Sequence, residues 1–153
     1  GSDEKGALAK SHGCTHIINY NKENFVERVK EITGGKGVPV VYDSIGKDTF
    51  IQSLDCLAPL GMMVSYGSAS GPVPPFSLNE LASRGSLFLT RPSLFNYAAQ
   101  RSDLEAMAAD LFHMVETGKV NIDINQRYAL KDAQQAHRDL ESRKTTGSTI
   151  LIP

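Results

Sequence analysis

The stretch Val38-Pro-Val-Val-Tyr-Asp-Ser-Ile-Gly46 is a short apolar run that ends in small polar residues and a glycine. A second run, Gly61-Met-Met-Val-Ser-Tyr-Gly67, repeats the pattern, and residues 47–59 between them carry apolar side chains at helical spacing. Strand, helix and strand in this order predict the unit of a parallel sheet. Residues just past the carboxyl ends of parallel strands face the ligand crevice of such a sheet. We therefore expect ligand contacts from the residues that follow the two strands, Ser44, Gly46, Tyr66, Gly67 and Ser68.

The composition bounds the class of protein. The 153 residues are predicted to form one domain, residues 1–153, with enough apolar content for a core. A net charge of -1 argues against a general nucleic-acid binding function, and the apolar runs are too short to cross a membrane. Cys14 and Cys56 are isolated, without metal-ligand spacing, which favours reduced thiols in a cytoplasmic protein.

The remaining chain alternates between helical and strand patterns. Ser2 or Asp3 can cap a first helix, and two S-x-x-E capping boxes, at 77–80 and 102–105, predict the starts of two others. We expect helices over 2–13, 24–33, 77–83, 102–118 and 131–143, and further strands over 15–20, 86–91, 128–130 and 148–152. This alternation predicts an α/β protein.

The predicted order of elements begins with a helix. A doubly wound domain ordinarily starts with a strand and a glycine-rich phosphate loop, and neither precedes that helix here. We therefore expect a truncated Rossmann-like, doubly wound, mostly parallel sheet that lacks its first strand and its glycine-rich loop.

Six segments in the same order resemble one protein family. They are Val40–Gly46, Ser53–Leu57, Gly61–Gly67, Leu89–Leu94, Leu130–His137 and Thr146–Pro153. Together they resemble the cofactor domain of zeta-crystallin-like quinone oxidoreductases, the zinc-free, NADPH-using members of the medium-chain dehydrogenase/reductase superfamily. The resemblance covers nearly all of this chain but about half of a family member. It implies that the amino-terminal barrel-like catalytic domain is absent.

The resemblance also implies an activity and an assembly. In the intact family, hydride passes from the nicotinamide of NADPH to a quinone or a similar electron-poor acceptor. No residue here is an obvious general acid, so no catalytic residue is assigned, and the chain by itself is expected to have little turnover. Family members resemble homodimers joined through an edge strand, which here is the predicted strand 86–91.

Lys5 is the first cofactor candidate that the resemblance implies. A family lysine in this turn faces the 2′-phosphate of NADPH, and a phosphate held against protein needs a charge-assisted partner. The alternative is a solvated lysine on a helix that also carries Asp3 and Glu4. An acid near this turn can instead select the ribose hydroxyls of NAD.

The other cofactor candidates follow the same resemblance. Tyr20 would lie near the adenosine and Arg143 near its phosphate, although an aromatic residue that closes a strand edge and a surface arginine are the alternatives. Arg91 and Pro92 would pass near the nicotinamide, although Arg91 could equally be a strand-end charge in water. The residues implied on the nicotinamide-ribose side are Ser44, Tyr66, Gly67 and Ser68. At Gly67, the lack of a side chain would let the backbone approach a ligand closely.

Other functions fit the residues less well. Asp43 is predicted to cap a neighbouring turn rather than to act as a catalytic acid. The four histidines are scattered, and Ser44 lies in no G-x-S-x-G motif, which disfavours a hydrolase. A methyltransferase would require a G-x-G-type loop near an acidic strand end, and none is visible there. A non-catalytic binding or structural module, crystallin-like or in contact with nucleic acid, stays as the alternative to an oxidoreductase.

Overall fold

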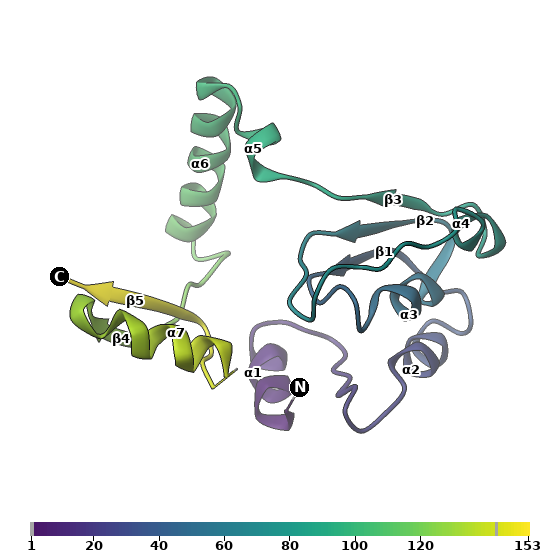
Figure 1. The fold of residues 1–153 in the computed structure, drawn as a ribbon, viewed down its shortest axis with the longest axis horizontal. Coiled ribbons are helices and arrows are strands. Elements are labelled where there is room, and N and C mark those ends of the chain that lie inside the picture. The colour runs from purple at the N-terminus through teal and green to yellow at the C-terminus, as the bar shows by residue number, and fades with distance from the viewer. Residues whose placement is uncertain (1, 143) are drawn as a thin grey trace. The chain divides into compact units, whose positions relative to one another are not determined.

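The fold is that of a computed structural model, which describes residues 2–142 and 144–153. The chain divides into two compact units, Gly1–Asn96 and Tyr97–Pro153, and each is treated by itself (Figure 1). None of the helices in the described part of the chain combines the length and the apolar character that a membrane crossing needs.

The first unit is built around a parallel three-stranded sheet in the order β1-β2-β3. Strand β1 (Val38–Asp43) is followed by helix α3 (Phe50–Asp55), β2 (Leu57–Ser65) and, later, β3 (Phe88–Thr90). Asp43 is aligned with Ser65, so β1 and β2 end at the same level and open into loops at one edge of the sheet. The predicted strand–helix–strand unit is thus present.

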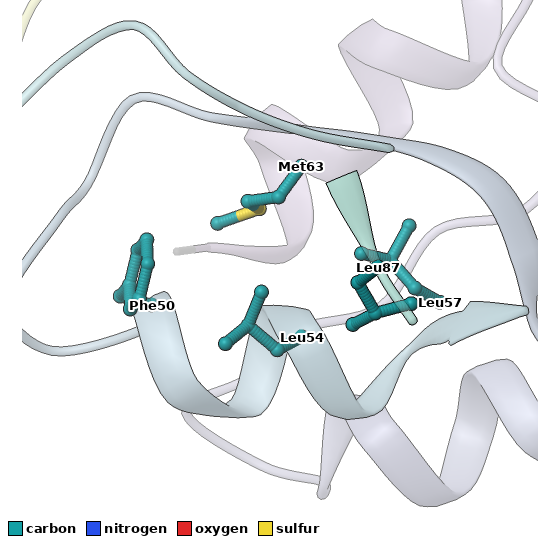
Figure 2. Close-up of a cluster of buried hydrophobic side chains, with 5 residues drawn as sticks. All are labelled: Phe50, Leu54, Leu57, Met63 and Leu87. Atoms are coloured by element: carbon teal, nitrogen blue, oxygen red, sulfur yellow. The ribbon is translucent and has the colours of Figure 1, made fainter. Parts of the chain in front are cut away.

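A small apolar core lies between α3 and the sheet. Phe50 and Leu54 project from α3 toward Met63 of β2, and Leu57 and Leu87 complete the buried cluster (Figure 2). Leu54 and Met63 are fully buried. Full burial of a side chain of this kind contributes about 1.5–3 kcal/mol, so this cluster holds α3 against the sheet.

Two helices precede the sheet, and both begin as predicted. In α1 (Asp3–Ser11) the Ser2 hydroxyl accepts a hydrogen bond from the Lys5 backbone N–H at 3.3 Å. In α2 (Phe25–Ile32) the Asn24 side chain accepts one from Val26 N–H at 3.0 Å. These bonds satisfy donors that the first helical turn leaves without an intrahelical partner.

The prediction of a strand over 15–20 is wrong. This segment is irregular, and its backbone pairs with no strand among the described residues. Side chains take part in local hydrogen bonds instead: Asn19 N–H donates to Glu23 Oε1 at 3.3 Å, and Asn19 Oδ1 accepts from Asn21 N–H at 3.2 Å. Ile17 packs against α1, where a Cβ at Gly6 would come within 2.7 Å of the Ile17 Cγ2. A segment with strand-forming residues becomes a strand only where a neighbouring strand supplies hydrogen bonds.

Both capping boxes are wrong in detail. Helix α4 (Asn79–Ser83) has Leu78 at its cap; the Ser77 hydroxyl accepts from Asn79 N–H at 3.2 Å, but Glu80 pairs with Arg84 instead of closing the box. Helix α6 (Arg101–Glu116) begins one residue before Ser102, with Gln100 at its cap and no side-chain capping bond. Glu80 forms an ion pair with Arg84, and Glu105 forms one with Arg101, so neither glutamate closes its capping box.

The second unit carries the carboxyl-terminal part of the chain. After the short helix α5 (Leu94–Tyr97), which the sequence analysis missed, and α6, strand β4 (Ile124–Ala129) pairs in parallel with β5 (Ser148–Ile152). A 3₁₀ turn (Leu130–Asp132) and α7 (Ala133–Glu141) connect them, and the Tyr128 hydroxyl donates to Asp139 Oδ2 at 2.8 Å. The final strand begins and ends as predicted.

Candidate functional site

The loops after β1 and β2 are joined into one structure, which we call the strand-end platform (residues 43–48 and 66–71). Tyr66 N–H donates to the Asp43 carbonyl at 2.9 Å, and Ala69 N–H donates to the Ser44 carbonyl at 3.1 Å. Both the N–H and the hydroxyl of Ser70 donate to the Ile45 carbonyl, each at 2.8 Å. The backbone around the predicted ligand residues is therefore held by its own hydrogen bonds.

The Asp43 carboxylate holds the loop after β1 in place through hydrogen bonds. It is 4% exposed. Its Oδ1 accepts from the N–H groups of Ile45 and Gly46 at 2.7 and 2.9 Å. Its Oδ2 accepts from the hydroxyls of Thr49 and Ser53 at 2.7 and 2.8 Å. Burial acts to raise the pKa of Asp43, but the four hydrogen bonds outweigh it and the pKa lies below its usual value. The prediction that Asp43 caps a turn is confirmed.

Gly67 lies where the two loops pass closest to each other. A Cβ at this position would lie 2.4 Å from the Ser44 carbonyl oxygen and 2.7 Å from the Ser44 Cα. Real Cβ contacts are not this short, and backbone atoms cannot turn aside as a side chain can. The structure thus supplies a reason for glycine here that differs from close approach to a ligand: Gly67 lets the β2 loop lie against the β1 loop.

Arg91, just past the end of β3, binds the platform. Its Nη1 donates to the carbonyl oxygens of Ser65 and Gly67 at 2.8 and 3.1 Å, and its Nη2 donates to the Ser68 hydroxyl at 3.4 Å. Arg91 is exposed, as the alternative of a strand-end charge requires, but its guanidinium binds two backbone carbonyls and the Ser68 hydroxyl. Arg91 joins the end of the third strand to the loop that follows the second.

An open pocket of about 260 Å³ lies beside the end of β1. Three aromatic residues, Tyr20, Phe25 and Tyr42, line it together with Ser44. The remaining lining residues are Asp43, Ile45, Thr49 and Ser53. Two of the predicted cofactor residues, Tyr20 and Ser44, are therefore brought to one pocket from segments more than twenty residues apart, and its lining combines aromatic and polar residues.

Lys5 lies in the first turn of α1, near a second group of charges. Asp3 accepts a hydrogen bond from Asn19 Nδ2 at 2.8 Å and forms an ion pair with Lys22. The hydrogen bond from Lys22 is the main reason that the pKa of Asp3 lies below its usual value, and the bond to Asp3 raises the pKa of Lys22. We call Asp3, Asn19 and Lys22 the α1 clip, since they tie the loop that carries Tyr20 to the helix that carries Lys5.

The other predicted residues have simpler surroundings. Tyr66 and Ser68 are exposed in the β2 loop, and Pro92 is half-buried directly after Arg91. Arg143 lies outside the described residues. The contributions of Thr49, Ser53 and Lys22 were not predicted. Thr49 at the cap of α3 and Ser53 one turn later both donate to Asp43, a spacing that could have revealed them, whereas nothing in the sequence links Lys22 with Asp3.

No metal-binding group is found in the part of the chain that the structure describes: nowhere do three His, Cys, Asp or Glu side chains gather. The two cysteines are free thiols in different surroundings, Cys14 exposed and Cys56 buried. Burial raises the pKa of Cys56 to about 11, and the Asp55 charge adds to this effect, so the thiol stays protonated at neutral pH. Neither cysteine is arranged as a zinc ligand.

Comparison with known proteins gives a consistent family. The model of a family described as zinc-binding dehydrogenase matches residues 12–151. A quinone oxidoreductase from Pseudomonas aeruginosa is 53% identical over 152 residues, which are 99% of this chain and 47% of that protein. One from Salmonella typhimurium is 54% identical over 155 residues, covering 100% of this chain and 47% of its own length. The chain thus spans about half the length of the curated relatives it matches.

A solved structure supports the same relationship. The quinone oxidoreductase of Escherichia coli, complexed with NADPH, superposes with a TM-score of 0.96 at 49% identity, over 100% of this chain and 48% of that one. The resemblance to quinone oxidoreductases that the six segments indicated is therefore confirmed. So is the fold class, a Rossmann-like α/β arrangement with parallel strands.

Proposed function

Because this chain belongs to the zinc-binding dehydrogenase family, we propose that it is the NADPH-binding part of an NADPH-dependent quinone oxidoreductase. The observation that carries the proposal is the pocket beside the end of β1, where Tyr20 and Ser44 meet. A nucleotide needs a flat apolar contact for its base and polar groups for its sugar and phosphates. The three aromatic side chains and Ser44 of the pocket, and Lys5 on α1, are groups of this kind.

Each candidate residue has a role in this proposal. Tyr20 contacts the adenosine, and Lys5 and Arg143 face its phosphate, where a cation offsets the charge of the phosphate oxygens. Ser44 and the β2 loop, Tyr66 to Ser68, line the nicotinamide-ribose side, with Arg91 and Pro92 beside it. When bound, NADPH supplies the hydride that reduces a quinone or a similar electron-poor acceptor. This chain's residues bind and orient; none of them is assigned a proton transfer.

Metal chemistry has no part in the proposal. The family's description names zinc, but the described residues of this chain offer no set of ligands for it. Zinc independence is part of the proposal, and no residue of this chain is given a role in binding a metal. A cytoplasmic location, expected from the two unpaired cysteines, belongs to the same proposal.

The test is a calorimetric titration of this chain with NADPH and, in parallel, with NADH. We expect NADPH to bind more tightly, and Lys5→Ala to remove most of that preference. Lys10→Ala is the matched control, since Lys10 lies in the last turn of the same helix. No binding of either nucleotide would contradict the proposal that this chain carries a cofactor site, and would favour a non-catalytic module instead.

Turnover is expected to be low for the chain alone. The names of the relatives attach quinone oxidoreductase activity to proteins about twice this length. A quinone-dependent NADPH oxidation rate in the ordinary range of enzymes, at least about 1 per second, would contradict this expectation. The assay uses a soluble quinone at saturating NADPH, with oxidation followed by absorbance.

The proposal extends to a homodimer joined through the edge strand 86–91. Among the described residues, β3 pairs with β2 alone, and the exposed fractions of Phe88 and Leu89 are 55% and 37%. An unpaired apolar edge favours pairing with a second strand. Light scattering should give a dimer mass that falls to the monomer mass in Leu89→Lys. A monomer at high concentration in the unmodified chain would exclude this assembly.

A further inference from the structure

The guanidinium of Arg91 occupies an unusual position relative to the cofactor residues. One of its nitrogens reaches the carbonyl oxygens of both Ser65 and Gly67, the two residues that flank Tyr66. The other reaches the Ser68 hydroxyl. A donor shared by the carbonyls on both sides of a residue restricts the backbone of that residue. The Arg91 side chain therefore acts on the whole segment from Tyr66 to Ser68.

The same segment is held from its other side by the β1 loop. The N–H groups of Tyr66 and Gly67 both donate to the Asp43 carbonyl, at 2.9 and 3.4 Å. Gly67 lies directly against the Ser44 backbone, as its missing Cβ shows. Without Arg91, these contacts would still hold the side that faces β1. The carbonyls of Ser65 and Gly67 would lose their charged donor, and the side that faces β3 would be free to move.

We infer that Arg91 is a positioning residue: it holds Tyr66, Gly67 and Ser68 in the geometry that receives the nicotinamide half of the cofactor, instead of contacting the cofactor itself. This inference rests on the proposed function. The chemistry requires arginine, because a planar guanidinium presents several N–H donors in a fixed fork and can bridge separate acceptors, whereas a lysine ammonium is a single point donor on a flexible stem. Arg91→Lys keeps the charge and removes the bridge.

The first measurement needs no cofactor. Amide hydrogen exchange is followed in the unmodified chain, in Arg91→Lys and in the control Arg101→Lys, whose arginine makes an exposed ion pair on α6. We expect exchange of the amides of residues 66–70 to rise at least about tenfold in Arg91→Lys only, with the amides of β1 and α3 unchanged. Unchanged exchange at 66–70 would overturn the inference, because the bridge would then hold nothing in place. A rise throughout the first unit would overturn it too, by showing a merely structural role.

The second measurement separates positioning from contact. NADPH is compared with 2′,5′-ADP, which has the adenosine with its 2′- and 5′-phosphates but no nicotinamide half. If Arg91 positions the β2 loop, Arg91→Lys weakens NADPH about tenfold and leaves 2′,5′-ADP within twofold. Weaker NADPH binding without faster amide exchange would mean that Arg91 contacts the cofactor directly. That result would overturn this inference but leave the proposed function standing. If neither ligand binds the unmodified chain, the proposed function fails, and the role assigned to Arg91 fails with it.

Discussion

Two aspartates of the first unit have lowered pKa values for opposite structural reasons. Asp43, in the strand-end platform, is 4% exposed and accepts four hydrogen bonds from neutral donors. Asp3, in the α1 clip, has a side chain that is 67% exposed and owes its shift mainly to Lys22. The same direction of pKa shift therefore describes a buried network in one place and a solvated ion pair in the other.

This difference suggests separate roles for the two aspartates, one in the stability of the fold and one in the choice of nucleotide. Buried, fully satisfied networks hold a backbone in place, and removal of one group leaves others without partners. Exposed ion pairs contribute little to stability, because water screens them and long side chains lose entropy when they are held. We expect the platform to govern the free energy of unfolding and the α1 clip to govern the local charge that a nucleotide phosphate meets.

The largest effect is expected from Gly67→Ala. The added methyl group would meet the Ser44 backbone, so the two loops must separate, and we expect the free energy of unfolding to fall by about 3 kcal/mol. Urea denaturation measures this change. The control is Gly34→Ala, where a positive φ of 59° carries a cost of about 1 kcal/mol but no neighbour lies within 4 Å. Equal losses in both variants would show that contact with Ser44 is unimportant.

Asp43→Asn should have the next largest effect. The amide keeps the shape but presents N–H donors to a site arranged for an acceptor, and we expect a loss of about 2 kcal/mol in the free energy of unfolding. Asp3→Asn is the control, with an unfolding midpoint that stays within experimental error of the original. If the two variants lost equal stability, the distinction between the platform and the α1 clip would be wrong.

The pH dependence of stability gives a smaller and more specific signal. The folded-state pKa of Asp43 lies below its ordinary value of 3.8, so its stabilising contribution is present above that value. The contribution decreases as the pH falls below 3.8 and is lost as the pH passes through the folded-state pKa. Urea midpoints of the original chain and Asp43→Asn should therefore differ most above pH 4 and converge in stronger acid. A difference that stays constant down to pH 2 would contradict this assignment.

The smallest effect on stability is expected from Lys22→Ala. The Lys22 side chain is 63% exposed, so the unfolding midpoint should not change measurably. The uncompensated Asp3 carboxylate would, however, repel a phosphate bound near Lys5. We expect NADPH affinity to fall about threefold while NADH affinity is unchanged. Calorimetry of the double variant Asp3→Asn/Lys22→Ala should recover the original preference; without that recovery, Lys22 does not act through Asp3.

The candidate site was only partly predictable. Ser44 and Tyr66 to Ser68 follow from one rule, that loops at the carboxyl ends of parallel strands form the ligand edge, and the turn-capping role of Asp43 follows from its place beside a strand end. Tyr20 was expected on a strand and lies in an irregular loop instead. The contacts of Arg91 with Ser65 and Gly67 link positions more than twenty residues apart, and no local pattern indicates them.

The sequence by itself determined most of the helices, the strand–helix–strand unit of β1, α3 and β2, and the family. Apolar periodicity, the cap at Ser2 and six segments in order depend on neighbours along the chain, which a sequence displays directly. Only the tertiary structure decided what each polar group binds. Residues 15–20 were predicted as a strand but find no strand partner among the described residues. The Gly67 backbone lies against Ser44 rather than in open space, and Asp3 forms an ion pair with Lys22. Pairing, close packing and charge neutralisation depend on which atoms meet across the fold, because each needs a partner that is close in space and distant in sequence.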